Sequence, residues 1–398
     1  MARRIAPLRD FLENESASGI LLLGAAGIGL LVANSPLADA YFEFLAFDFK
    51  IELPGIYISL TTLKVINYCL MTIFFFVVGL EIKRELTAGN LATLRRAAAP
   101  IFAAIGGMAV PALVYLAVAG SVAPEGWAVP VATDIALAVG VLALIGSRAT
   151  QGLKAFLLAI AVLDDIGAIL IIAIVYSTGV IFSWLAGALL AVVLVLTMQR
   201  LRIKRIYTYV VVGAAIWYCF YRAGIHPTLA GVLMGLLTPA TTESNDVGID
   251  IEDGELTLVE RLEHRFHPLS SFFVVPIFAF ANSGVALSRE ALEAALSSPI
   301  AWGIVLGLVA GKPVGIFLTS LAVARLRIAE LPDGMTRAAL FATGSTAGIG
   351  FTVAIFIAKL AFADAATQDL AVVAVIVGSL VSALVATLLF RFGGAKTR

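Results

Sequence analysis

The sequence is poor in charged residues. Only 14% of its 398 residues are charged and 61% are hydrophobic, whereas a soluble domain has about 25% charged and about 45–50% apolar residues. A large soluble helical core is a poor interpretation, because most apolar segments have no polar face. With 27 basic and 27 acidic residues the net charge is zero, so no basic surface for nucleic acid is indicated.

Cysteine is nearly absent, and so are the motifs of ATP-driven chemistry. The two cysteines, Cys69 and Cys219, lie within apolar runs, which predicts small buried side chains and neither a disulfide nor a metal site. No phosphate-binding loop of the G-x-x-x-x-G-K-[ST] type occurs, so an ion gradient is the expected energy source. We expect no cofactor. No signal-peptide cleavage site is evident, so the first apolar helix is expected to be retained.

Long apolar runs are abundant. A transmembrane helix needs about 20 apolar residues, and the runs predict an all-α polytopic membrane protein, a single transmembrane domain over 1–398. The twelve candidate helices are 16–33, 62–82, 97–119, 127–146, 154–176, 180–199, 206–222, 226–240, 269–288, 301–323, 337–360 and 369–392.

The distribution of Lys and Arg predicts the orientation. When the segments between candidate helices are assigned to alternating sides, 21 basic residues fall on the side of the N-terminus and five on the other, with Lys312 inside a helix. Basic residues favour the cytoplasmic side. The sequence therefore predicts a multi-pass protein of the bacterial inner membrane with both termini in the cytoplasm.

Two segments between the candidate helices have a different pattern. Residues 41–60 alternate apolar and polar residues around Pro54 and Gly55, which predicts an extracytoplasmic β-hairpin. Its exposed edge could pair with a second copy and form a homodimer, although an interfacial loop lying on lipid headgroups fits equally well. Residues 241–268 are polar and acidic, and predict a cytoplasmic loop.

Four charged residues stand inside apolar runs: Asp134, Asp164, Asp165 and Lys312. An ionised side chain at the middle of a bilayer costs at least about 2.5–3.5 kcal/mol, and such residues are usually functional. The alternative is a charge cluster that only fixes helix packing, but a buried ion pair is a poor source of stability. Three carboxylates against one lysine leave excess negative charge, which a cation or protons could satisfy.

Helix geometry separates the adjacent acids. Successive residues point about 100° apart, so one aspartate could pair with Lys312 while the other faces a water-filled cavity. A desolvated carboxylate beside a like charge can hold either a proton or a dehydrated sodium ion, which is sufficient for exchange with alternating access. Neutral oxygens, such as the Thr133 hydroxyl and carbonyls freed by a broken helix, would complete a sodium site.

Two of the candidate helices look breakable. Pro130 precedes Asp134 and removes a backbone donor, and Gly344, Gly348 and Gly350 provide permissive backbone inside 337–360, although glycines there could merely permit close packing. Interrupted segments in corresponding places of two halves point to a transporter site. The third to fifth and the tenth to twelfth helices are therefore predicted to be inverted-topology repeats whose fourth and eleventh helices break and cross.

The chain resembles the NhaA-type sodium/proton antiporters over about residues 10–390. The resemblance rests on ordered blocks, which are FFFVVGLEIKREL (74–86), PVATDIALAVGVLALIG (130–146), VLDDIGAI (162–169), GIHPTLAG (224–231), LEHRFHP (262–268), FAFANSGV (278–285), GKPVGI (311–316) and GIGFTVAIFI (348–357). It implies exchange of cytoplasmic Na⁺ or Li⁺ for external H⁺, electrogenic and regulated by pH, that serves sodium and pH homeostasis.

The resemblance also implies roles for individual residues. Asp165 is the expected ligand of cation and proton, Asp164 pairs with Lys312 in one state, and Thr133 adds an oxygen. Asp134 and Lys312 are expected to balance the ends of the crossed half-helices. The resemblance places the cytoplasmic pH-regulating group at Glu81, Arg84, Glu85, Glu263, His264 and His267. His226 matches a position that is linked to the pH response on the other side.

Simpler interpretations of the pH-regulating group remain open. His226 is followed by Pro227 near a helix start and could act only as a cap. Glu81 and Arg84 could form an ordinary helix-end ion pair. The acidic residues before Arg261 depart from the more basic loop of the family, so the family's pH profile is not carried over to this chain.

Two other functions fit parts of the pattern. A sodium-coupled symporter would need a polar substrate cavity, and no additional buried polar set indicates one. An intramembrane aspartyl protease needs two carboxylates that share a proton, whereas the adjacent acids diverge and a lysine accompanies them.

Overall fold

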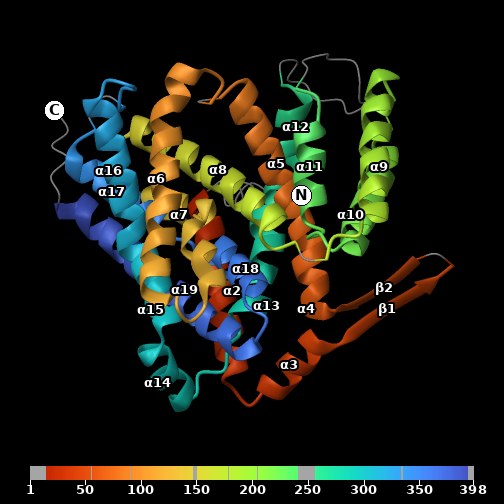
Figure 1. Cartoon of the computed structure of the whole chain (residues 1–398), viewed down its shortest axis with the longest axis horizontal. Helices are drawn as coiled ribbons and strands as arrows, with labels where there is room; N and C mark the ends of the chain where they lie inside the picture. Colours follow the sequence, from red (N-terminus) through yellow and green to blue (C-terminus); the bar gives the residue numbers. More distant parts are fainter. Residues whose placement is uncertain are drawn as a thin grey trace, which may run out of the picture.

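The computed structural model describes residues 15–392 except 55, 90, 147–149, 178, 204, 241–255 and 333–334. Helices dominate the described residues (Figure 1). The elements up to the end of α10 are α2 (Glu15–Ala33), α3 (Ala38–Ala46), β1 (Asp48–Leu53), β2 (Ile56–Thr61), α4 (Thr62–Val65), η2 (Ile66–Leu70), α5 (Met71–Thr87), α6 (Leu94–Ala119), η3 (Pro124–Val131), α7 (Ile135–Ile145), α8 (Gln151–Ile174), α9 (Phe182–Arg200) and α10 (Ile206–Ala223).

The remaining elements continue the helical pattern. They are α11 (Leu229–Leu237), α12 (Leu258–Leu269), η5 (Ser270–Val274), α13 (Val275–Ser283), α14 (Arg289–Ser297), α15 (Pro299–Leu306), η6 (Gly307–Gly311), α16 (Lys312–Arg325), α17 (Arg337–Ala347), α18 (Phe351–Ala361) and α19 (Ala365–Phe392). Three of the elements, η2, η5 and η6, are π-helical turns, each within a longer continuous helix.

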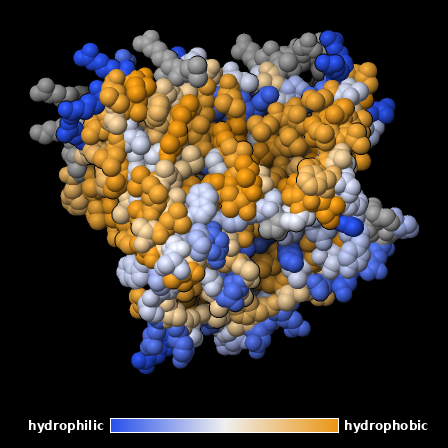
Figure 2. Space-filling view, in the orientation of Figure 1, coloured by the Kyte–Doolittle hydropathy of each residue, from blue (hydrophilic) through white to orange (hydrophobic). Residues whose placement is uncertain are grey.

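Length and composition identify the membrane-spanning helices. Among the described residues, eight helices are long and apolar enough to cross a membrane, or up to ten if two bent helix pairs each form one span. Hydrophobic side chains cover the middle of the face shown in Figure 2, and hydrophilic ones gather at its two ends. The chain is thus an all-α polytopic membrane protein. The count of twelve spans stays a prediction, because α11, at nine residues, covers only roughly 14 Å.

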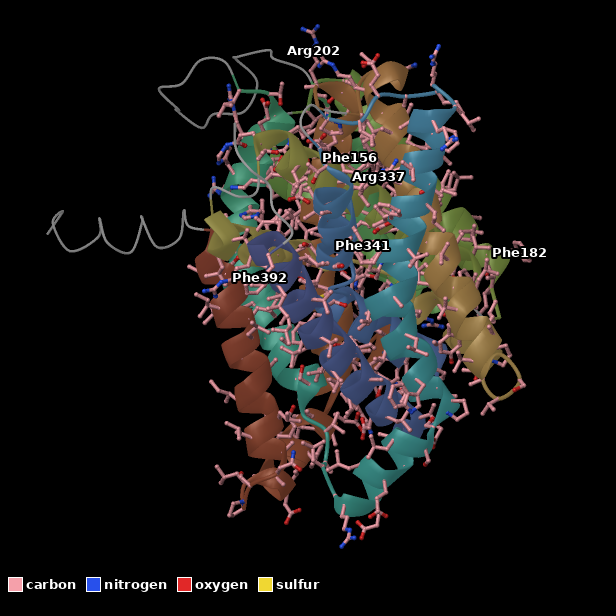
Figure 3. The ribbon with its side chains drawn as sticks, turned by 90° about the vertical axis from the view of Figure 1, so that its left-hand side faces the viewer. Phe156, Phe182, Arg202, Arg337, Phe341 and Phe392 are labelled. Atoms are coloured by element: carbon pink, nitrogen blue, oxygen red, sulfur yellow. The ribbon has the colours of Figure 1, made fainter. Side chains whose placement is uncertain are left out.

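The two ends of the molecule differ in what they carry. In Figure 1, α3 and α14 lie at the lower end, the hairpin projects to the right from the lower half, and the start of α12 lies at the upper end. Figure 3 places Arg202, just after α9, at the upper end, with Phe182, the first residue of α9, lower in the molecule. We call the end that holds the hairpin the hairpin end.

Close approach of α5 and α11 depends on glycine. A Cβ atom at Gly231 would overlap the Thr72 carbonyl oxygen, and one at Gly235 would come within 2.6 Å of the Phe76 carbonyl oxygen. Gly79 makes the reciprocal contact from α5, where a Cβ would lie 2.6 Å from the Val232 carbonyl oxygen. Small residues at both faces let the backbones touch, as they do between membrane helices generally.

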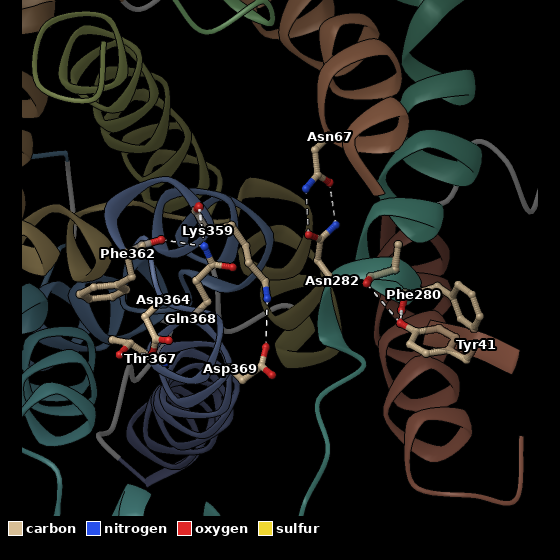
Figure 4. Close-up of polar contacts among 11 residues, drawn as sticks. Tyr41, Asn67, Phe280, Asn282, Lys359, Phe362, Asp364, Thr367, Gln368 and Asp369 are labelled. Carbon is tan, nitrogen blue, oxygen red and sulfur yellow. Dashed lines mark hydrogen bonds and ion pairs between the residues drawn. The ribbon is translucent and has the colours of Figure 1, made fainter. Parts of the chain in front are cut away.

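Two polar contacts show that α5 and α13 run antiparallel. Asn67 in η2 and Asn282 in α13 exchange two amide hydrogen bonds, of 3.1 and 2.8 Å (Figure 4). At the opposite end, Arg84 of α5 pairs with Glu263 of α12 at 2.6 Å. The start of one continuous helix therefore meets the end of the other.

Figure 4 also shows how the hairpin end of α18 and α19 is fixed. Lys359 forms an ion pair with Asp369 at 3.1 Å. Asp364 accepts hydrogen bonds from the backbone N–H and the hydroxyl of Thr367 at the start of α19, and these bonds lower the pKa of Asp364. Because Gln368 donates to the carbonyl oxygens of Lys359 and Phe362, the end of α18 is capped by side chains from α19.

The hairpin is shorter than the predicted 41–60. Strands β1 and β2 pair antiparallel from Asp48 opposite Thr61 to Leu53 opposite Ile56. Residues 41–46 belong instead to α3, which bends by 110° from α2. This part of the prediction is wrong because Tyr41 and Leu45, four residues apart, are both buried, which is helical spacing. Strand β2 is held to α10 by the hydroxyls of Tyr218 and Tyr221.

The predicted loop 241–268 and the predicted burial of cysteine also need correction. Residues 258–268 are helical, because Thr257 and Glu260 form a capping box that starts α12. Residues 241–255 lie outside the described part of the chain. Cys69 is exposed and Cys219 is half-buried. A side chain in an apolar membrane helix can face either protein or lipid. An apolar run therefore does not by itself predict burial within the protein.

Candidate functional site

Two helical segments are interrupted where they meet. η3 ends at Val131, residues 132–134 are not helical, and α7 begins at Ile135. α17 ends at Ala347 and α18 begins at Phe351, with a bend of 49° between them. The backbone N–H of Asp134 donates to the carbonyl oxygen of Ile349 at 2.7 Å, so the two interruptions are in direct contact.

Asp134 serves the N-terminal ends of two helices. Its Oδ1 accepts from the backbone N–H of Leu137 at 3.0 Å and thereby caps α7. Its Oδ2 accepts from the backbone N–H of Thr352 at 3.0 Å and from the Thr352 hydroxyl at 2.5 Å, at the start of α18. Asp134 is buried, with 2% of its surface exposed. A negative charge is favourable there because both helix starts carry partial positive charge.

Lys312 interacts with both a carboxylate and the C-terminal end of a helix. Its Nζ lies 2.8 Å from Oδ2 of Asp164, and both side chains are fully buried. The same ammonium group donates to the carbonyl oxygen of Val131, the last residue of η3. Lysine carries three donors, so one cation neutralises the carboxylate and the negative helix end together.

The Thr133 hydroxyl lies between a carboxylate and the second helix end. Its Oγ1 is 2.8 Å from Oδ2 of Asp164 and 2.9 Å from the carbonyl oxygen of Ala347, the last residue of α17. A hydroxyl has one proton, so it can donate to only one of these acceptors at a time. When it donates to Ala347, its lone pairs are free to face a cation beside Asp164.

Asp165 points to a different environment from Asp164. Asp165 interacts electrostatically with Glu81 of α5, Asp164, Asp134 and Lys312. It is 5% exposed. Asp164 keeps Oδ1 buried without a hydrogen-bond partner among the described residues. Three carboxylates and one lysine therefore occupy one buried region, and Oδ1 of Asp164 is available to a further ligand.

Four of the predicted pH-sensing residues lie together where α5 meets α12. Arg84 contacts Glu263 at 2.6 Å and Glu85 at 3.7 Å. Glu81 lies one turn nearer to Asp165 on the same helix, and Oε2 of Glu263 is buried without a hydrogen-bond partner among the described residues. This group connects the end of α5 to the buried acids.

The three histidines are placed differently. His264 and His267 are exposed on α12, and His267 lies 3.4 Å from the Ser271 hydroxyl. His226 lies apart from them, buried between the rings of Tyr68 and Phe356, with Nδ1 at 2.7 Å from the Thr228 hydroxyl. The structure thus brings His264 and His267 near the acidic group and leaves His226 elsewhere.

Three groups that contact this site were not predicted from the sequence, namely two backbone carbonyl oxygens and Thr352. The carbonyl oxygens of Val131 and Ala347 face it only because their helices end there, and a sequence does not show which carbonyls are free. Thr352 follows Gly350 and Phe351 in the block GIGFT. The position of Thr352 two residues after Gly350 could have indicated its role, because a threonine in the first turn after a helix break can contact a neighbouring helix end.

The chain is similar to known proteins over nearly its whole length. Residues 9–390 match the family model described as Na⁺/H⁺ antiporter 1. The chain is 43% identical over 382 residues to the Na⁺/H⁺ antiporter NhaA of Shewanella sp. strain MR-7, with 95% of each chain covered. It is 43% identical to the NhaA of Mesorhizobium japonicum, covering 96% of this chain and 94% of the relative.

A more distant relative gives the same result. The chain is 39% identical to NhaA 1 of Clostridium beijerinckii over 390 residues, which is 97% of this chain and 95% of the relative. These proteins are named as transporters, which removes the interpretation as a protease. The chain belongs to the Na⁺/H⁺ antiporter 1 family.

Proposed function

We propose that this protein exchanges cytoplasmic Na⁺ or Li⁺ for external H⁺ in the bacterial inner membrane, driven by the proton gradient and without a cofactor. The observation that carries the proposal is the buried group of Asp134, Asp164, Asp165 and Lys312 at two interrupted helices. The antiporters named among its relatives support it.

Asp165 is the proposed site of competition between cation and proton. Burial beside other carboxylates makes an uncompensated charge costly, so the group is stable only when a proton or a cation is bound. Asp164 can supply Oδ1, which has no hydrogen-bond partner among the described residues. Thr133 can supply its hydroxyl oxygen once its proton points to Ala347.

Lys312 is the proposed switch, because its ammonium group pairs with Asp164. A bound Na⁺ would compete with the ammonium for Asp164 and favour release of a proton from the lysine. Because several carboxylates and a lysine titrate as a coupled set, we propose more than one proton per cation, which makes exchange electrogenic.

The architecture we propose has twelve spans with both termini in the cytoplasm, and inverted repeats formed by the third to fifth and tenth to twelfth helices. The group at the end of α5 (Glu81, Arg84, Glu85, Glu263, His264 and His267) then faces the cytoplasm and regulates exchange by pH. The hairpin lies outside, and its β1 edge offers backbone groups for pairing with a second copy as a homodimer.

One assay tests the exchange function. Everted vesicles are loaded with a proton gradient, and addition of Na⁺ or Li⁺ is expected to collapse it, with little response to K⁺. Asp165→Asn is expected to abolish the response, because the amide cannot exchange a proton for a cation. Asp39→Asn, on an exposed position of α3, is the matched control and should respond like the parent. A normal response from the Asp165→Asn protein would refute the assignment.

A further inference from the structure

The short helix α14 has an apolar face that the rest of the described chain leaves open. None of its nine residues is buried in the described part of the chain, and only Ala295 is half-buried. Leu292 and Leu296, one turn apart on one side of the helix, are 45% and 71% exposed. An isolated helix of fewer than roughly 12–15 residues is marginal in water, so α14 needs a partner that covers its leucines.

The opposite side of α14 is polar. Glu290 lies two residues before Leu292, and at about 100° per residue the two side chains leave the helix in nearly opposite directions. Arg289 and Glu293 form an exposed ion pair at 2.9 Å on the flank of the helix. Charges on one side and leucines on the other are typical of a helix that lies in a membrane interface.

The neighbours of α14 in the chain place it at a membrane surface. It connects two membrane-spanning helices, of which one ends at Ser283 and the next begins at Pro299. Nine helical residues extend only about 14 Å, less than half of the roughly 30 Å hydrocarbon core. The helix therefore stays on the side where both spans meet the surface, which is the hairpin end (Figure 1).

Both ends of α14 are fixed, so its apolar face has a defined direction. Before the helix, the side chain of Asn34 donates to the Val285 carbonyl oxygen at 2.8 Å and accepts from the Leu287 N–H at 2.6 Å. After the helix, the indole N–H of Trp302 donates to the Leu296 carbonyl oxygen at 2.8 Å.

Trp302 indicates what covers the leucines. It lies near the start of α15 and is 47% exposed within a membrane span, and Leu306, one turn further into that span, is 38% exposed. Exposed apolar side chains of a membrane span face lipid, and tryptophan is enriched where the hydrocarbon meets the headgroups. Because Leu296 is bonded to Trp302, the apolar face of α14 continues the lipid-facing surface of α15.

We propose that α14 lies in the membrane interface at the hairpin end and inserts Leu292 and Leu296 among the lipid acyl chains. Its partner is the lipid surface. The attraction is apolar, because α14 carries one arginine against two glutamates and anionic headgroups would not attract it. This anchor holds the connection between α13 and the helix that carries Lys312 at the membrane surface, and it is independent of the proposed ion exchange.

Spin labels at single cysteines test the anchor in the full-length protein, with Cys69 and Cys219 replaced by Ser, in phosphatidylcholine vesicles. Oxygen concentrates among acyl chains and the nickel complex NiEDDA stays in water, so their collision rates with a label report where the label lies. The ratio of oxygen to nickel collisions should be several-fold higher for Leu292→Cys than for Glu290→Cys on the opposite side. Leu306→Cys on α15 is the reference for lipid, and Leu292→Cys should resemble it more closely than Glu290→Cys does.

Three results would overturn the proposal. Equal ratios for Leu292→Cys and Glu290→Cys would place both sides of the helix in the same medium. Low collision rates with both reagents at Leu292→Cys would show that protein, such as a second copy of the chain, covers the face. A ratio that rises only when phosphatidylglycerol is added would show attraction by headgroup charge. If the Leu292→Cys protein is not recovered in folded form, Leu296→Cys replaces it with the same expectation.

Discussion

The ammonium group of Lys312 lies 2.8 Å from Oδ2 of Asp164 in a region where both side chains are completely shielded from solvent. Loss of one partner from such a pair leaves an unpaired charge, which costs about 3–5 kcal/mol. The lysine also binds the Val131 carbonyl, so its removal leaves the end of η3 without this cation.

Lys312→Met is therefore expected to lower the melting temperature of the purified protein strongly. The double variant Asp164→Asn with Lys312→Met should recover most of the loss, because the unpaired charge is gone. Lys359→Met is the control. Its pair with Asp369 is partly exposed, and exposed pairs contribute about 0–1 kcal/mol. Equal losses for both lysines would contradict the described burial of Lys312.

Gly231→Ala should separate α11 from α5. The added Cβ would overlap the Thr72 carbonyl oxygen, which belongs to the backbone and cannot rotate away. Overpacking costs typically about 1–3 kcal/mol, so thermal unfolding should begin at a lower temperature. Gly24→Ala is the matched control, since no described atom outside its own stretch of helix lies within 4 Å of its Cβ position. Identical unfolding curves for the two variants would show that the helices are not in contact at Gly231.

The Asn67–Asn282 pair should couple energetically. Each single change to Ala removes both amide hydrogen bonds, so the double variant should be less destabilised than the sum of the single ones. The coupling free energy from a double-mutant cycle is expected to be about 1 kcal/mol. Gln368→Ala combined with Asn67→Ala should be additive, because the bonds of Gln368 go to the end of α18. A coupling free energy of zero for the asparagines would count against the pair.

Thiol labelling tests the orientation. In a protein with Cys69 and Cys219 replaced by Ser, Ser297→Cys on α14 should react with an impermeant reagent added to intact cells. Arg337→Cys should react only after the cells are permeabilised, because it starts α17 at the other end (Figure 3). Both original residues are exposed, so reactivity reports the side of the membrane. The reverse pattern would invert the proposed topology.

The sequence predicted the membrane fold well because apolar length is a physical requirement of the bilayer. Each of the twelve candidate segments overlaps a helix of the structure, although the number of spans stays a prediction. The sequence did not predict that the first strand begins only at Asp48. Phe42 and Phe44 are two residues apart, as in a strand, whereas Tyr41 and Leu45 are four residues apart, as in a helix. The capping box at Thr257 was also not predicted. It starts α12 within a segment that the sequence analysis predicts to be a loop.

The sequence alone predicted the charged residues of the site but few of their contacts. Asp134, Asp164, Asp165 and Lys312 stood out because charge is expensive in an apolar run. Helix geometry alone left open which of Asp164 and Asp165 meets Lys312. The resemblance to the antiporter family implied Asp164, and Asp164 is the residue that forms the pair.

The π-turn η6 ends at Gly311, directly before Lys312. Such a turn holds one more residue than an α-turn, and it therefore rotates everything that follows by about 100° relative to the α15 segment. The direction in which Lys312 points is thus set by a phase shift in its own backbone. If the same number of residues formed a regular α-helix, Lys312 would point about 100° away from its present direction and its ammonium group would turn away from Asp164, although every residue of the site would still be present.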